Sequence, residues 1–142
     1  MKKIAVLHGP NLNLLGIREP NIYGDLSLDE LNESLSAMAS DAGFELVAIQ
    51  SNIEGELVNA LQEQGFSSHG IIFNPGGYTH TSVALRDAVA AIASPVIEVH
   101  LSHPDAREEF RRNSLLREVC VGSITGLGAE SYQAALRYFM GQ

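Results

Sequence analysis

The chain has 142 residues, of which 45% are hydrophobic, and a formal net charge of −8. This length fits one ordinary domain with a sizeable core, so we expect a single domain over residues 1–142. The acidic balance argues against non-specific binding to nucleic acid or to an anionic membrane, because both need clustered Lys and Arg. It leaves room for a small anionic substrate, since a few local cations can dominate a pocket.

Cys120 is the single cysteine, so neither an intrachain disulfide nor a cluster of thiolate ligands can form. It lies in the apolar run 119–121, which predicts a buried structural thiol. The apolar run near the N-terminus covers only residues 4–7, which is too short for a secretory signal. No run approaches the ~18 residues of a membrane span. We therefore expect a soluble, cytoplasmic protein.

Five short apolar runs, rich in Val and Ile, occur at residues 4–7, 46–49, 70–73, 96–99 and 119–121. They are mostly continuous rather than alternating, which is typical of strands buried on both faces of a parallel sheet. Helical periodicity fills the intervals. One helix begins at the capping box Ser27-Leu-Asp-Glu30 and ends at Gly43, and the others cover 51–65, 81–92 and 130–140. The alternation predicts a flavodoxin-like, doubly wound five-stranded parallel sheet of order 2-1-3-4-5, with helices on both faces.

A long loop follows the first predicted strand. Residues 9–24 read GPNLNLLGIREPNIYG, and loops longer than about 12–15 residues are usually either functional or disordered. Disorder fits poorly, because Leu12, Leu14, Leu15 and Ile17 interleave the polar residues. We expect this loop to fold down onto the domain.

Four of the five apolar runs are followed by hydrogen-bonding side chains: His8, the Gln50-Ser51-Asn52 segment, Asn74, and His100 with Ser102. Ligands of open α/β sheets bind beyond the carboxyl ends of the strands, so this edge is the candidate site. For any one residue, the alternative is that a strand end is polar because it reaches water. The third run continues as NPGGYTH through His80, a turn whose glycines let backbone N–H groups approach a ligand.

Several familiar site motifs are missing. The chain has no GxGxxG, no GxxxxGK[ST] and no GxSxG, which leaves dinucleotide, phosphate-loop and nucleophile-elbow chemistry without support. It has five histidines but no HExxH, so a metal site built from His8, His80 and His100 is a weak alternative. Acid–base chemistry among His100, Tyr23, Arg18 and amides remains.

Several multi-residue motifs follow one another in order from Gly9 to about Ser114. They are GPNLNLLG at 9–16, REP at 18–20, IYG at 22–24, SN at 51–52 with EGE at 54–56, NPG at 74–76, YTHTSVALRD at 78–87, IEVHLS at 97–102 and ARE at 106–108. With these motifs at this spacing, the chain resembles type II 3-dehydroquinate dehydratase. The resemblance implies reversible loss of water from 3-dehydroquinate, through an enolate, to 3-dehydroshikimate. This step serves aromatic amino acid and chorismate biosynthesis (the shikimate pathway) or quinate breakdown.

The resemblance also implies a set of roles, with no metal, no organic cofactor and no covalent intermediate. Tyr23 matches the base, His100 the acid, Arg18 the arginine that stabilises the transition state, and Asn11 the residue that orders a water near the enolate oxygen. The substrate binders would be Asn74, His80, Asp87 and Arg111, with the backbone N–H groups of Leu101 and Ser102 cradling the carboxylate. Asp87 would act toward a neighbouring subunit, which implies a homododecamer built from trimers.

Tyr23 needs help to act as a base. A free phenol has a pKa near 10, so only about one in a thousand is ionised at pH 7. Lowering that pKa by two units requires about 2.7 kcal/mol in favour of the phenolate. A guanidinium within about 4–6 Å can supply this, and Arg18 lies five residues upstream in the same loop. The loop is therefore predicted to be a lid that brings both side chains over the substrate.

This chain departs from the family pattern beside the expected site. Ile53 replaces a common histidine, His103-Pro104-Asp105 replaces Asn-Ile-His, and Arg112-Asn113 replaces His-His. Pro104 removes a backbone donor and stiffens its loop. His103 is either a group that titrates beside an anionic ligand or an exposed loop histidine.

Two further questions stay open at the level of sequence. Glu98 lies two residues before His100 and hence on the same strand face, where it either orients the imidazole or pairs with Arg107. A binding module without turnover and a metal-assisted lyase or hydrolase remain competing functions.

Overall fold

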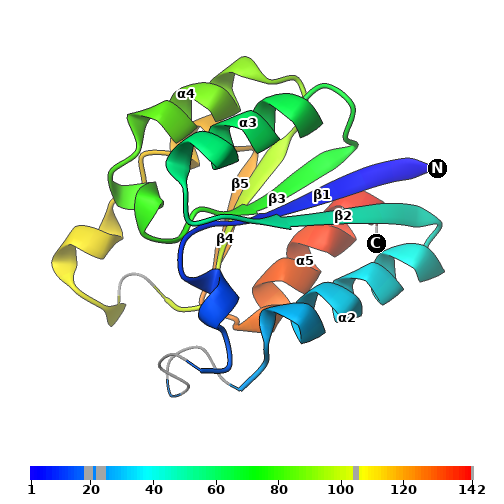
Figure 1. The fold of residues 1–142 in the computed structure, drawn as a ribbon, viewed down its shortest axis with the longest axis horizontal. Helices are drawn as coiled ribbons and strands as arrows, with labels where there is room; N and C mark the ends of the chain where they lie inside the picture. Colours follow the sequence, from blue (N-terminus) through cyan, green and yellow to red (C-terminus); the bar gives the residue numbers. More distant parts are fainter. Residues whose placement is uncertain (18–20, 22–24, 104–105, 142) are drawn as a thin grey trace.

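The computed structural model describes residues 1–17, 21, 25–103 and 106–141. Five parallel strands form one sheet in the order β2-β1-β3-β4-β5, as the sequence predicts. They are β1 (Lys2–His8), β2 (Phe44–Gln50), β3 (Gly70–Asn74), β4 (Val96–His100) and β5 (Gly122–Thr125). Helices α2 (Leu28–Asp41) and α5 (Ala129–Met140) cover one face, while α3 (Glu54–Gln64) and α4 (Val83–Ala91) cover the other (Figure 1). No described helix is both long and apolar enough to cross a membrane.

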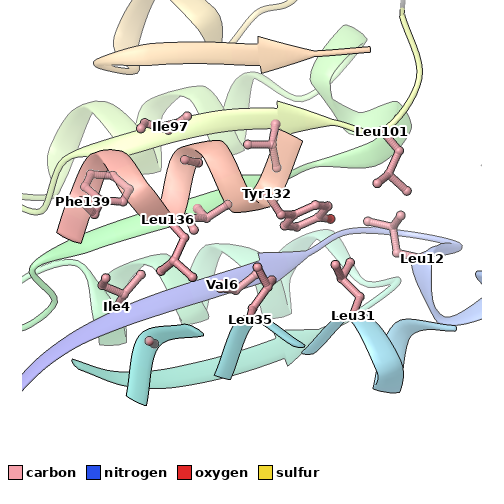
Figure 2. Packing of buried hydrophobic residues seen from close by; sticks show 14 of the residues in the cluster. Ile4, Val6, Leu12, Leu31, Leu35, Ile97, Leu101, Tyr132, Leu136 and Phe139 are labelled. Carbon is pink, nitrogen blue, oxygen red and sulfur yellow. The ribbon is translucent and has the colours of Figure 1, made fainter. Parts of the chain in front are cut away.

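The core consists of two apolar clusters, one on each face of the sheet. Ile4 and Val6 of β1 point toward α2 and α5, while Ala5 and Leu7 point toward α3 and α4. Each central strand alternates in this way, so every residue of β3 and β4 is buried. Figure 2 shows the α2/α5 side, where Tyr132 lies across the cluster with its hydroxyl directed toward the end at which Leu12 and Leu101 lie.

The two edge strands differ from the prediction. β2 is only partly buried, since it has a neighbour on one side alone. The fifth strand begins at Gly122, whereas the apolar run predicts 119–121; Arg117–Val119 instead form a 3-10 helix, η5. Val119 and Cys120 pack against the α3/α4 side of the core as part of the connection, and their apolar character reflects that packing rather than a strand. Cys120 is partly buried, and burial, with the nearby charge of Glu98, raises the pKa of its thiol to about 12.

Local signals fix most helix ends. The capping box is confirmed: the Ser27 side chain accepts from the backbone N–H of Glu30, whose carboxylate accepts from the backbone N–H of Ser27. The second helix ends at Gly65 as predicted but begins at Glu54, because the Ser51 hydroxyl bonds to the backbone of Ile53 ahead of the helix. The third begins at Val83, with Ser82 as its cap.

Candidate active site

A pocket lies beyond the carboxyl ends of β1, β3 and β4, where the doubly wound topology predicts a ligand site. It encloses about 540 Å³ of empty space, including solvent at its mouth. Its lining comes from the loop after β1, the turn after β3, the end of β4 and the segment that follows β4. The lining residues are Asn11, Leu12, Leu15, Asn74, Gly76, His80, His100, Leu101, Ser102, Arg107 and Arg111.

The charge of this pocket opposes that of the whole chain. The described lining contains two arginines and two histidines but no carboxylate, although the chain carries a formal charge of −8. Such a pocket attracts a small anion, because local cations set the potential inside a concave site.

Two backbone segments touch beside the pocket, at the start of the loop after β1 and in the turn after β3. The N–H of Gly9 donates to the carbonyl of Asn74 at 2.7 Å. A Cβ atom on Gly9 would lie 2.5 Å from the carbonyl oxygen of Pro75, so only glycine fits. Gly76 adopts φ +61, a backbone conformation that side chains disfavour. The turn after β3 can therefore run close to the loop after β1.

The loop after β1 is held by residues expected to line the site. Asn52 accepts from the N–H of Asn11 at 2.9 Å, and Gln50 donates to the carbonyl of Gly9 at 3.2 Å. Asn11 sits at φ 70, a left-handed conformation that Asn tolerates better than most residues. Gln50 and Asn52 are absent from the described lining and support the loop instead. Ser51 bonds to the start of α3.

The four aliphatic residues of this loop divide into two pairs. Leu12 and Leu15 are buried in the α2/α5 cluster and also line the pocket. Leu14 and Ile17 are exposed. Two of the four side chains therefore anchor the loop to the core. The loop also contains one turn of 3-10 helix, η1 (Leu12–Leu14). Arg18 and Tyr23 lie outside the described residues.

His100 ends β4 against a buried carboxylate. Its Nε2 atom lies 2.6 Å from Oε2 of Glu98, and Glu98 is fully buried. A carboxylate accepts hydrogen bonds, so Nε2 carries a proton and donates it to Glu98. The imidazole is thereby fixed in one orientation, which is the first of the two roles that the sequence leaves open for Glu98.

Two hydroxyls complete the surroundings of Glu98. Thr79 donates to Oε2 at 2.6 Å and Ser114 donates to Oε1 at 2.7 Å. Burial by itself raises the pKa of Glu98, but the hydrogen bond and charge of His100, together with the two hydroxyls, outweigh it and lower that pKa below its ordinary value. Glu98 is therefore a buried carboxylate that stays ionised. Thr79 and Ser114 are not identified at the sequence level, because their partner is distant in the chain.

His80 and Arg111 line the pocket from the turn after β3 and from the segment that follows β4. Nδ1 of His80 donates to the carbonyl of Asn113 at 2.7 Å. Because this hydrogen bond goes to the backbone of residue 113, it does not depend on the unusual side chain at that position. Arg111 donates to the exposed carboxylate of Glu108 and lies 4.9 Å from the ring centroid of Phe110. The charge-assisted hydrogen bond from Arg111 lowers the pKa of Glu108.

Three predicted site residues lie elsewhere. Asp87 is exposed on α4 and absent from the described lining. His103 lies in an adjacent hollow with Ser102 and Arg107. His8 is fully buried behind the pocket, since alternation along β1 turns its side chain toward α2 and α5.

The surroundings of His8 give the three-histidine metal site no support. Both ring nitrogens of His8 have hydrogen-bond partners, Tyr132 at 3.0 Å and Asn32 at 2.8 Å. Over the described part of the chain, no group of three or more His, Cys, Asp or Glu side chains is placed to hold a metal ion.

Comparison with known proteins places this geometry in a family. The family model described as dehydroquinase class II matches residues 2–140. The 3-dehydroquinate dehydratase of Bordetella avium is 55% identical over 138 residues, covering 96% of each chain. That of Geotalea daltonii is 53% identical over 135 residues, covering 95% of this chain and 94% of its own. A crystal structure of type II dehydroquinase from Butyrivibrio crossotus superimposes with a TM-score of 0.95 at 43% identity, covering 97% of each chain. The chain therefore belongs to the dehydroquinase class II family.

Proposed function

We propose that this protein catalyses the reversible dehydration of 3-dehydroquinate to 3-dehydroshikimate, in the shikimate pathway or in quinate breakdown, with neither metal nor organic cofactor. One observation carries the proposal: a buried carboxylate–histidine pair, Glu98 and His100, ends at a pocket lined by arginines. An anionic substrate suits those cations, and the pair can store and deliver a proton. Membership of the class II family supplies the substrate class.

The proposed reaction moves two protons. The phenolate of Tyr23 removes a proton from the carbon next to the ketone, which gives an enolate. Protonated His100 then gives a proton to the departing hydroxyl, and the electrons of the enolate expel it as water. The products are the conjugated enone and water, with Tyr23 protonated and His100 neutral, and one proton transfer resets the site.

The geometry of Glu98 suits His100 to the acid role. Nε2 of His100 is committed to the carboxylate, which leaves Nδ1 as the ring nitrogen that would face substrate. For Nδ1 to donate, the imidazole must carry both protons and a positive charge. An ionised carboxylate at 2.6 Å stabilises that charged form. Glu98 thus acts through His100 and is a positioning residue.

The proposed base, Tyr23, belongs to the loop after β1. Asn11, Leu12 and Leu15 from the described start of this loop already line the pocket, and Tyr23 follows within a dozen residues. A guanidinium from the same loop, Arg18, would lower the pKa of the phenol by favouring the phenolate.

The other lining residues would hold the substrate. Asn74 and His80 would bind its hydroxyl groups, and Arg111 offers a further cation. The backbone N–H groups of Leu101 and Ser102 would cradle the carboxylate, as oriented N–H groups do in other anion sites. Asn11 would order a water at the developing enolate oxygen, because an amide both donates and accepts.

The role of Asp87 requires assembly. Within one chain it is exposed on α4, one turn after Val83, a large apolar side chain that is 58% exposed on the same helix face. A neighbouring subunit packed on this face would cover Val83 and take up Asp87 at its own pocket. We expect a dodecamer of trimers, which light scattering would report as about twelve times the chain mass of 15.3 kDa.

The decisive experiment is turnover of 3-dehydroquinate, followed by the ultraviolet absorbance of the conjugated enone. We expect product to form at the same rate with and without a chelator. Binding of a substrate analogue without product would indicate a binding module, and turnover that the chelator abolishes would indicate metal-assisted chemistry. Either result would overturn the proposal.

Tyr23→Phe tests the base. Removing one oxygen should lower kcat by about 10²–10⁴-fold, the usual contribution of a general base, while the protein stays folded. Tyr138→Phe is the matched control, since Tyr138 is exposed on α5 and should tolerate the change. Activity of Tyr23→Phe near that of the control would eliminate Tyr23 as the base.

A further inference from the structure

A chain of buried hydrogen bonds links His8 to the pocket. Nδ2 of Asn74 donates to the hydroxyl of Tyr132 at 3.0 Å, and that hydroxyl lies 3.0 Å from Nδ1 of His8. Nε2 of His8 lies 2.8 Å from Oδ1 of Asn32. His8 and Tyr132 have no exposed surface, and Asn74 is 3% exposed at the pocket wall.

The bonds in this chain have one consistent direction. Because Tyr132 accepts from Asn74, its own proton must go to His8, and Nδ1 of His8 must be the acceptor. Nε2 then carries the ring proton and donates to Asn32. This order requires a neutral imidazole, and burial lowers the pKa of His8 to about 4, so the ring is neutral at physiological pH.

The same bonds decide which way the Asn74 amide faces. Its Oδ1 accepts from the backbone N–H of Gly76 at 3.1 Å, and Tyr132 takes one of its two N–H groups. No other described residue accepts from the amide, so its second N–H is left for the pocket. A protonated His8 would instead donate to Tyr132, whose oxygen would then accept from both His8 and Asn74 and whose own proton would have no described acceptor.

We propose that His8 and Tyr132 are positioning residues that hold the Asn74 amide with one N–H presented to a substrate hydroxyl. The inference rests on the proposed function for the identity of the substrate. His8, which ends β1 beside the pocket but does not line it, thereby acts on the substrate through Tyr132 and Asn74.

Tyr132→Phe tests the relay in the enzyme, because it removes one oxygen and keeps the ring that fills the core. KM for 3-dehydroquinate should rise about five- to tenfold, the factor that one net hydrogen bond is worth, with kcat within threefold. A purely structural role would lower stability and leave KM unchanged, and that result would overturn the proposal. Tyr138→Phe controls for loss of a phenol elsewhere on α5.

A matched pair at His8 tests the acceptor. Oδ1 of an asparagine occupies about the position of Nδ1, so His8→Asn should keep KM within about twofold. His8→Leu has the same branching without polar atoms and should raise KM about as much as Tyr132→Phe. Equal KM values for the two variants would contradict the relay.

A double-mutant cycle separates positioning from general damage. In an Asn74→Ala background there is no amide to orient, so adding Tyr132→Phe should change KM by less than about twofold. A fold-change in KM of the double variant equal to the product of the two single-variant changes would show that Tyr132 acts independently of Asn74, against the proposal.

One measurement is independent of turnover. In ¹⁵N-labelled protein, ring correlations of His8 should show the neutral form with the proton on Nε2, from pH 8 down to about 5. A proton on Nδ1, or a titration midpoint near 6.5, would refute the relay even in an active enzyme. If the wild-type protein fails to convert 3-dehydroquinate while His8 shows the expected form, the proposed function fails and the relay stands.

Discussion

His8 and His100 occupy similar positions but contrasting surroundings. Both end a buried parallel strand, and neither is more than 9% exposed. His100 meets the ionised carboxylate of Glu98 on the α3/α4 side of the sheet. His8 meets a phenol and an amide on the α2/α5 side. Burial makes a charge costly unless an opposite charge compensates it. We infer that the partner, rather than the depth of burial, decides which of the two histidines suits the proposed acid role.

The largest expected effect follows from removing the proposed proton donor, His100. His100→Gln keeps an N–H for Glu98 but has no proton to give to a leaving hydroxyl. We expect kcat to fall about 10²–10⁴-fold, against a nearly unchanged kcat in His8→Asn. Steady-state rates from enone absorbance measure both. A His100→Gln enzyme that keeps a tenth of wild-type kcat would contradict the proposed role of His100 as proton donor.

The pH dependence of stability should report His8. Its pKa is lowered from 6.5 to about 4 in the folded protein, so the unfolded chain binds more protons between these values. The contribution of His8 to stability is therefore complete above about pH 6.5 and is lost as the pH falls toward 4, by about 3 kcal/mol in total.

Urea unfolding of the wild type and of His8→Asn at pH 7 and pH 5 measures this difference. The lowered pKa of Glu98 acts only below 4.5, so Glu98 does not contribute to a change between pH 7 and pH 5, and the comparison with His8→Asn isolates the part that comes from His8. The variant should lose less stability than the wild type between the two pH values. Equal losses of stability in the wild type and in His8→Asn would contradict the lowered pKa of His8.

Replacing the carboxylate should make the two histidines more alike. Glu98→Gln keeps the shape but leaves His100 beside a neutral amide, as His8 already is. A hydrogen bond to a charged group contributes about 1.5–3 kcal/mol, so we expect kcat to fall about 10- to 100-fold. The control is Glu45→Gln, at an exposed position on β2. A kcat for Glu98→Gln equal to that of the control would contradict the positioning role of Glu98.

The smallest expected effect concerns one supporting hydroxyl. Thr79→Val removes a donor to Glu98 and keeps the branched shape, while His100 and Ser114 still bond to the carboxylate. Stability should fall by about 1–2 kcal/mol and kcat by less than about tenfold. Thermal unfolding with kinetics on the same preparation tests this. An unchanged Tm would mean that two donors suffice.

The sequence predicts the parts of the site that depend on local pattern. Asn74 and His100 follow continuous apolar runs, and such runs end at the ligand edge of a parallel sheet, so their presence in the pocket could be foreseen. The glycines of the turn after β3 indicate a close approach of backbone there. The family motifs add Asn11, His80, Ser102 and Arg111, all of which line the pocket.

Other parts depend on contacts far apart in the chain. His8 follows an apolar run just as His100 does, but the side chain that buries it is 124 residues away. Thr79 and Ser114 reach Glu98 from separate segments. The triplet 119–121 is as apolar as a strand, yet Val119 and Cys120 belong to the connection before β5 and pack against the α3/α4 side of the core. Asp87 lies away from the pocket of its own chain.

The sequence by itself determined the alternation of strands and helices, the cap at Ser27 and the polar residues at the strand ends, since each follows from short-range periodicity and backbone chemistry. The tertiary structure decided toward which face of the sheet the side chain at each strand end points. It also decided whether that side chain meets a carboxylate or an amide on that face. That choice set His100 beside a charge and His8 beside a phenol. The reason is that the proton affinity of a buried group depends on the neighbours that folding brings to it, and these come from distant parts of the chain.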